Sequence, residues 1–285
     1  MARYAGSDAL LSADAAVGRA APAVGRLGAH GLRLAVAAIY AFMLGPLCVI
    51  IVSSFDPTTA GAFPPRGFST RWYAAFAASD NFTSAFRFSL YLGLCAAVIA
   101  TAMGFVTSYA AVRFLGHRRE LGQSLALLPA VVPQILVSIS LLLALTVVPL
   151  PEFAALLGGH VLICLPFTVA GITASLDGVD AQLEAAAMTL GASRLRVLWE
   201  IVAPLIAPGI LSAFIFAFIV SFGDTYIALF LSGPGMTTLP IEVFAHIQWE
   251  STPVIAAITT VQVVLIVVLG LAVERLVGLN KIMRF

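Results

Sequence analysis

The feature that most restricts how this chain can fold is a series of apolar stretches, each long enough to cross a bilayer. A membrane-spanning helix needs about 20 consecutive apolar residues. Six stretches qualify, and they run roughly over residues 32–55, 86–113, 121–148, 155–176, 205–230 and 253–275. The chain is only 10% charged, whereas soluble domains carry about 25% charged residues. The sequence therefore predicts an all-α integral membrane protein with six transmembrane helices.

The distribution of basic residues predicts how these helices are oriented. If the N-terminus is inside, the segments on the inner side hold 12 of the 15 Lys and Arg residues; these segments are 1–33, 113–120, 177–204 and 275–285. Cytoplasmic loops carry the excess of Lys and Arg, so we expect both termini in the cytoplasm. Residues 1–31 lack the apolar core of a signal peptide. We expect a flexible cytoplasmic tail there, followed by a single membrane domain over 32–285 with no internal repeat.

Several classes of site find no support in the sequence. A net charge of +1 gives no overall field that would attract nucleic acid. A nucleotide-binding P-loop needs Lys followed by Ser or Thr, but the single lysine, Lys281, precedes Ile282. The three cysteines have no CxxC spacing and the four histidines are isolated, so no metal site is predicted. We therefore expect a membrane protein that is not an enzyme and holds no cofactor of its own.

The inner segment 177–204 is polar, unlike the apolar stretches on both sides of it. Asp180 is placed to cap a short helix over DAQLEAAAMTL, Gly191 then interrupts the chain, and Ser193 can cap a second helix, RLRVLWEIVA. In the second helix Leu195, Leu198, Trp199 and Val202 fall at helical spacing, which predicts one apolar stripe. The segment is thus expected to form a helix, a glycine bend and an amphipathic helix.

Two interpretations of this segment are open on physical grounds. An amphipathic helix can lie on lipid headgroups, or the segment can dock onto another protein. The first helix has mostly small side chains and one acid, Glu184, and offers little apolar surface to lipid. Its composition favours docking into a groove on a protein.

The segment resembles the EAA motif of the permeases of ATP-driven (ABC) importers. The matching residues are Glu184-Ala185-Ala186, Gly191, Ile201 and Pro204, with Ala203 where the family has Leu. The resemblance implies a type I importer permease whose coupling helix docks into an ATP-binding subunit. Glu184 would then make a polar contact with that subunit, Ala185 and Ala186 would allow close approach, and Gly191 would set the bend. Ala192 and Pro204 belong to the same coupling loop.

The resemblance also implies the partners of the chain. These are a second permease, expected to be a different chain, two ATP-binding subunits that bind the ATP and Mg²⁺, and a solute-binding protein. The location would be the bacterial inner membrane, with several passes through the lipid bilayer.

Three further stretches resemble the spermidine/putrescine group of these permeases, and its second permease in particular. They are FPPRGFSTRWYAAF at 63–76, LPAVVPQILVSISLLL at 128–143, and SFGDTYIALFLSGPGMTTLPIEVF at 221–244. The resemblance covers about residues 32–280 and implies import of a small amine-containing solute. Related permeases carry opines, aminobutyrate or aminoethylphosphonate, so these solutes stay open as alternatives.

Candidate residues for the translocation pathway are Asp224, Tyr226 and Pro133. An acid at membrane depth usually faces a cavity or a partner, and a carboxylate beside an aromatic ring suits a cationic amine. The alternative for Asp224 is that it caps a local helix break or sits at the hydrated membrane interface. Pro133 interrupts backbone pairing, which is tolerated at a water-filled path or in kinked packing. Glu242 and Glu250 are candidates for contact with the binding protein, or simply for a solvated surface.

The sequence supports two other classes of function less well than an importer permease. An ion-coupled secondary transporter usually carries intramembrane charges and internal repeats, of which the sequence offers only Asp224. An intramembrane enzyme would need paired catalytic groups, and no motif pairs the Ser and His residues present.

Overall fold

A computed structural model describes residues 31–59, 63–249 and 252–277 of the chain. These residues form helices and connecting turns, with no β-strand among them. The helices are an N-terminal helix Gly31–Ser53, α2 Arg71–Ala78, α3 Asp80–Arg113, α4 Arg119–Val131, α5 Gln134–Val147, α6 Glu152–Asp177, α7 Ala181–Thr189, α8 Arg194–Val197, α9 Ala203–Leu205, α10 Ala207–Phe222, α11 Tyr226–Leu231, α12 Leu239–Trp249 and α13 Val254–Val277. A 3₁₀ turn, Gly116–Arg118, precedes α4, and a π turn, Leu198–Val202, joins α8 to α9. The tail predicted over 1–31 lies almost wholly outside the described residues.

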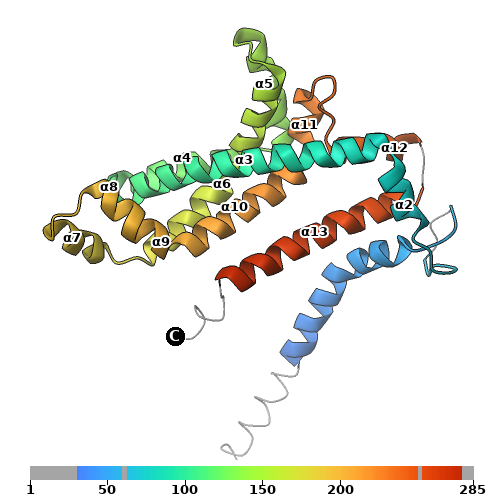
Figure 1. The fold of residues 1–285 in the computed structure, drawn as a ribbon, viewed down its shortest axis with the longest axis horizontal. Coiled ribbons are helices and arrows are strands. Elements are labelled where there is room, and N and C mark those ends of the chain that lie inside the picture. Colours follow the sequence, from blue (N-terminus) through green and yellow to red (C-terminus); the bar gives the residue numbers. More distant parts are fainter. Residues whose placement is uncertain (1–30, 60–62, 250–251, 278–285) are drawn as a thin grey trace, which may run out of the picture.

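The centre of the molecule is a bundle of α3, α6 and α10, with α4 against α6 (Figure 1). Small side chains allow these helices to approach closely. Ala96, Ala97 and Ala100 on α3 are fully buried, and the Thr168 hydroxyl on α6 donates to the Ala100 carbonyl at 3.0 Å. Small residues and interhelical hydrogen bonds are typical of helix packing in membranes, where lipid gives no hydrophobic drive for association.

The number of spans depends on whether two bent pairs of helices are each counted as one span. Four helices are each long and apolar enough to cross a bilayer, namely the N-terminal helix, α3, α6 and α13. The predicted span 121–148 is instead two helices, α4 and α5, which meet at 96°. The segments 194–205 and 207–222 meet at 72°, so the described residues offer four spans, or up to six if each bent pair counts as one.

Proline explains the break between α4 and α5. Val132 has φ −78° and ψ 134°, an extended conformation, and a residue before proline is disfavoured in the helical region. Pro133 then lacks a backbone N–H, so it can begin a helix but not continue one. The predicted span 205–230 is interrupted as well, because α10 ends at Phe222 and α11 begins at Tyr226.

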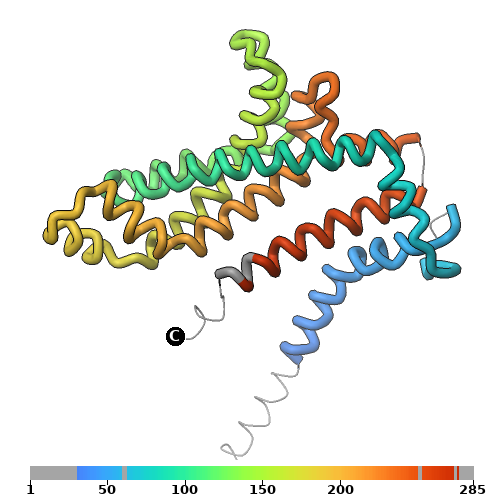
Figure 2. The backbone as a smooth tube through the Cα atoms, in the orientation of Figure 1, coloured from blue at the N-terminus to red at the C-terminus, as the bar shows by residue number. Residues whose placement is uncertain are grey.

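The two ends of the bundle carry different elements (Figure 1). α7 and α8 lie at one end, α2 and α12 lie at the other, and α5 projects from the side of the bundle together with α11. Figure 2 shows the chain leaving α6 at the α7 end and returning along the bundle as α10. The polar segment 177–204 is therefore a protruding end of the bundle, and Asp224 lies where α10 gives way to α11.

Candidate functional site

The segment 177–204 folds locally as its capping residues predict. The Asp180 carboxylate accepts from the Gln182 N–H at 2.9 Å and caps α7. Gly191 has φ +92°, a conformation that L-residues rarely adopt, and it turns the chain between the two helical parts. The Ser193 hydroxyl then accepts from the Arg196 N–H at 3.3 Å and caps α8.

The second helical part corrects the predicted amphipathic stripe. The chain does not form one regular helix, since α8 widens into the π turn before α9. Pro204 contributes to this, because it cannot donate to the carbonyl four residues earlier and its ring crowds that carbonyl. The wider turn buries Val197 and Val202, five residues apart, while Leu195 and Trp199 are 66% and 60% exposed.

The carboxylate of Glu184, for which the resemblance implies a polar contact with an ATP-binding subunit, turns toward its own bundle. The carboxylate accepts from Arg113 Nε at 2.7 Å and from the Tyr109 hydroxyl at 3.1 Å, both on α3. Arg113 Nη2 also donates to the Val179 carbonyl at 3.2 Å. The side chains of Arg113 and Glu184 are only 16% and 9% exposed. The acid of the motif thus joins α7 to its own bundle.

The small residues of the motif have the opposite placement. Ala185, Ala186 and Pro204 are exposed, while Ala192 is half-buried and packs against the core near Val197. A pocket of about 240 Å³ lies between α7, α8 and the last turns of α3, with Arg113, Glu184 and Arg194 in its lining. The outer face of α7 therefore offers small and apolar side chains at the end of the molecule.

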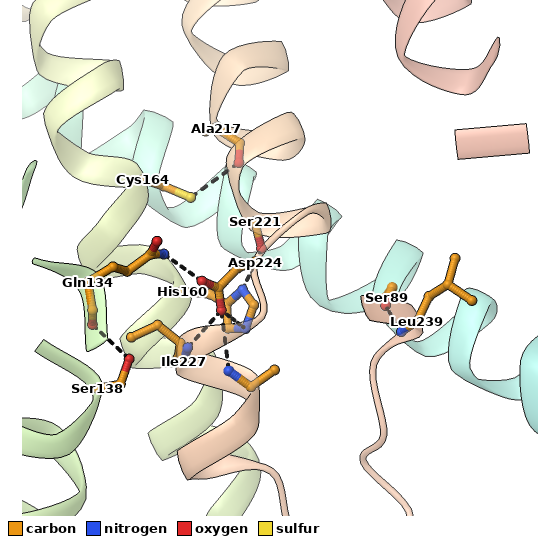
Figure 3. Close-up of polar contacts among 11 residues, drawn as sticks. Ser89, Gln134, Ser138, His160, Cys164, Ala217, Ser221, Asp224, Ile227 and Leu239 are labelled. Atoms are coloured by element: carbon orange, nitrogen blue, oxygen red, sulfur yellow. Dashed lines mark hydrogen bonds and ion pairs between the residues drawn. The ribbon is translucent and has the colours of Figure 1, made fainter. Parts of the chain in front are cut away.

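Asp224 is the centre of a second polar site, shown in Figure 3. It is 4% exposed, and its Oδ2 accepts from the N–H groups of Ile227 at 2.9 Å and Ala228 at 3.2 Å. Its Oδ1 accepts from the Gln134 side-chain amide at the start of α5. The carboxylate thus caps α11, as the alternative interpretation held, and also ties α11 to α5.

His160 on α6 completes this junction (Figure 3). Its Nε2 lies 3.8 Å from Asp224 Oδ2, and its Nδ1 shares a hydrogen bond of 2.8 Å with the Ser221 hydroxyl on α10. His160 is fully buried. Four helices therefore meet at one buried polar cluster, defined here as Gln134, His160, Ser221 and Asp224.

The other predicted pathway residues, Tyr226 and Pro133, lie close in sequence to Asp224 and Gln134. Tyr226 is 45% exposed, and Pro133 is exposed at the bend before α5. A pocket of about 290 Å³ includes Gly223 and Thr225, the two neighbours of Asp224 in sequence. Glu242 is half-buried in the first turn of α12. Glu250 lies outside the described residues.

A comparison with protein families decides the class of the molecule. Residues 100–280 match the family described as the binding-protein-dependent transport system inner membrane component. The chain belongs to this family. It is therefore an inner-membrane permease, a transport subunit and not an enzyme, and the family favours an ATP-driven importer over an ion-coupled secondary transporter.

Relatives along nearly the whole length agree with the family. The permease is 30% identical over 259 residues to the spermidine/putrescine transport system permease protein PotC of Escherichia coli K12, covering 90% of this chain and 96% of PotC. It is 34% identical over 232 residues to the putrescine transport system permease protein PotI of the same organism, covering 78% of this chain and 81% of PotI.

Solved structures agree on the fold. The permease superimposes with a TM-score of 0.70 on a chain of a bacterial ABC transporter that imports the acidic polysaccharide alginate. The match covers 93% of this chain and 100% of the other at 14% identity. At such low identity the likeness bears on the fold alone, which is that of a type I importer permease.

Sequence reasoning missed the partners inside the permease. Arg113 was used only for the orientation of the helices, and Gln134, His160 and Ser221 were not singled out. A polar side chain inside an apolar span is itself a signal, because such groups are rare there unless they are paired or functional. By that signal Gln134 and His160 could have been identified as candidate residues. Their shared contact with Asp224 could not have been predicted in this way.

Proposed function

We propose that this permease forms half of the path for a small amine-containing solute of the polyamine kind, delivered by a solute-binding protein. The observation that carries the proposal is the similarity to PotC and PotI over most of the chain. The helix, glycine bend and exposed small residues of segment 177–204 support it, because they suit a docking surface for an energy-supplying subunit.

The proposed assembly contains a second, different permease and two ATP-binding subunits that hold the ATP and Mg²⁺. In it, residues 32–285 form one membrane domain of six spans, with both termini and segment 177–204 on the cytoplasmic side. Ala185 and Ala186 face the ATP-binding subunit. The angle between the two helical parts of the loop is set by Gly191, Ala192 and Pro204. The ATP-binding subunit drives the permease through its contact with α7.

The proposed pathway runs past the bend at Asp224. The pocket of about 290 Å³ there is lined by Thr225, Phe244 and Gln262 among others. Asp224 supplies negative charge behind the pocket, Tyr226 offers an aromatic surface, and Pro133 shapes the bend before α5. The negative charge of a carboxylate and the faces of aromatic rings both attract an ammonium group. Glu242 and Glu250 contact the binding protein.

The mechanism follows from two states of the assembly. The loaded binding protein and ATP both favour the state in which the path opens outward, since a ligand shifts such an equilibrium by its differential affinity for the two states. ATP hydrolysis removes one of these ligands and returns the path to the inward-open state.

Uptake of labelled solutes by cells lacking the gene tests the solute class. We expect the restored gene to confer saturable uptake of spermidine or putrescine, and unlabelled polyamine to compete. Restoration of 2-aminoethylphosphonate or opine uptake alone would overturn the polyamine proposal while leaving the importer assignment in place.

A further inference from the structure

One side chain of α7 is buried against the bundle. Among the residues of α7, only Glu184 is buried. A buried carboxylate is costly unless it is paired and hydrogen-bonded, and Glu184 has both an ion pair with Arg113 and a hydrogen bond from Tyr109. Polar contacts with α3 therefore hold this helix to the bundle, together with the packing of Ala187 against the core.

The helix that receives this contact crosses the whole molecule. Arg113 is the last residue of α3, which has 34 residues and so extends for about 50 Å. Near its other end, the Ser89 hydroxyl accepts from the Leu239 N–H at 2.8 Å and holds the start of α12 (Figure 3). α3 thus contacts α7 at one end of the bundle and α12 at the other.

We propose that Tyr109 and Arg113 are positioning residues that make α7 and α3 move as one body. The inference rests on the proposed docking of an ATP-binding subunit at α7. Glu184 then acts through α3. Displacement of α7 passes to α3 and along it to α12, beside the proposed pathway.

The same end of the bundle offers a matched control. Arg119, the first residue of α4, forms an ion pair with Asp177 at 2.6 Å, but their side chains are 34% and 46% exposed. Such partly exposed pairs contribute little. Arg119→Gln therefore removes an equal charge and leaves the pair of Arg113 with Glu184 in place.

A double-mutant cycle on the full assembly tests the proposal, using Arg113→Gln, Glu184→Gln and the double variant. The readout is solute transported per ATP hydrolysed, with subunit stoichiometry measured in parallel. We expect each single variant to lower this ratio by roughly tenfold, with the double variant no worse than the single variants. Arg119→Gln should leave the ratio unchanged.

Conservative variants keep the test decisive if the glutamine variants assemble poorly. Tyr109→Phe retains the aromatic ring, and Arg113→Lys retains the positive charge. Both variants should assemble fully and lower the ratio of solute transported to ATP hydrolysed by a smaller factor. Additive losses in the cycle, or unchanged ratios in all of these variants, would overturn the proposal. Failure of polyamine uptake by the unmodified assembly would instead count against the proposed function.

Discussion

At the scale of single residues, the buried carboxylate of Asp224 serves two elements at once. It caps α11 through two backbone N–H groups and accepts from Gln134 on α5. A buried polar group left without a partner costs the full penalty of its desolvation. In this conformation Asp224 is therefore a structural junction, and a direct role in the pathway requires Gln134 or α11 to move.

Two substitutions of Asp224 separate these roles. Asp224→Ala leaves the N–H groups of Ile227 and Ala228 and the Gln134 amide without an acceptor. Each lost partner costs about 1–3 kcal/mol of folding stability, so we expect a clear loss of thermal stability. Asp224→Asn keeps an oxygen for capping, and asparagine is a good helix cap, so its loss of stability should be much smaller. Melting curves of the purified assembly measure both.

Uptake by the same two variants completes this comparison. A requirement for the negative charge itself would appear as lost uptake in Asp224→Asn with nearly normal stability. Equal stability of Asp224→Ala and the unmodified protein would contradict the junction described here.

At the scale of elements, glycines mark where helices touch. A Cβ added at Gly159 on α6 would lie 2.6 Å from Ile227 Cγ2 on α11, whereas one added at Gly158 has nothing within 4 Å. Ile227 is fully buried, and its β-branched side chain has few rotamers to escape into. Contact at Gly159 therefore sets the distance between α6 and α11.

The two neighbouring glycines give a matched pair of variants. Gly159→Ala should destabilise the permease by about 1–3 kcal/mol through overpacking. Gly158→Ala should be neutral or stabilise it by up to about 1 kcal/mol, because alanine favours the helix. Thermal unfolding of the two variants side by side checks this, and similar melting temperatures would show that α6 and α11 do not meet at Gly159.

The elements also show which features a sequence can reveal. The caps at Asp180 and Ser193 and the bend at Gly191 were predictable, because each depends on residues within a few positions. The ion pair of Arg113 with Glu184 spans 71 positions and the bond of Gln134 to Asp224 spans 90. Apolar periodicity predicts which face of a helix is buried, but not which helix packs against that face. Neither of these two contacts could therefore be predicted from the sequence.

The π turn shows a related limit. Regular spacing of Leu195, Leu198, Trp199 and Val202 predicted one apolar stripe, but that assumed 3.6 residues in every turn. The π turn changes the spacing locally, so Val202 of this stripe is buried together with Val197, while Leu195 and Trp199 are exposed.

At the scale of the whole molecule, burial divides the spans into two groups. In the most apolar 18-residue stretch of each helix, 56% of the residues of α6 and 44% of those of α3 are buried. The same fraction is 22% in α13 and zero in the N-terminal helix. α3 and α6 therefore form the inner framework, while the N-terminal helix and α13 present their side chains outward. The framework helices are also those that carry Arg113 and His160.

Transport driven by ATP in reconstituted vesicles tests the central claim most directly. Vesicles would contain this permease with its second permease and ATP-binding subunits, and binding protein with labelled polyamine would be supplied outside. We predict uptake that requires ATP on the side of segment 177–204 and binding protein on the other, and that persists when ionophores abolish all ion gradients. Uptake driven by an imposed ion gradient without ATP would contradict the account.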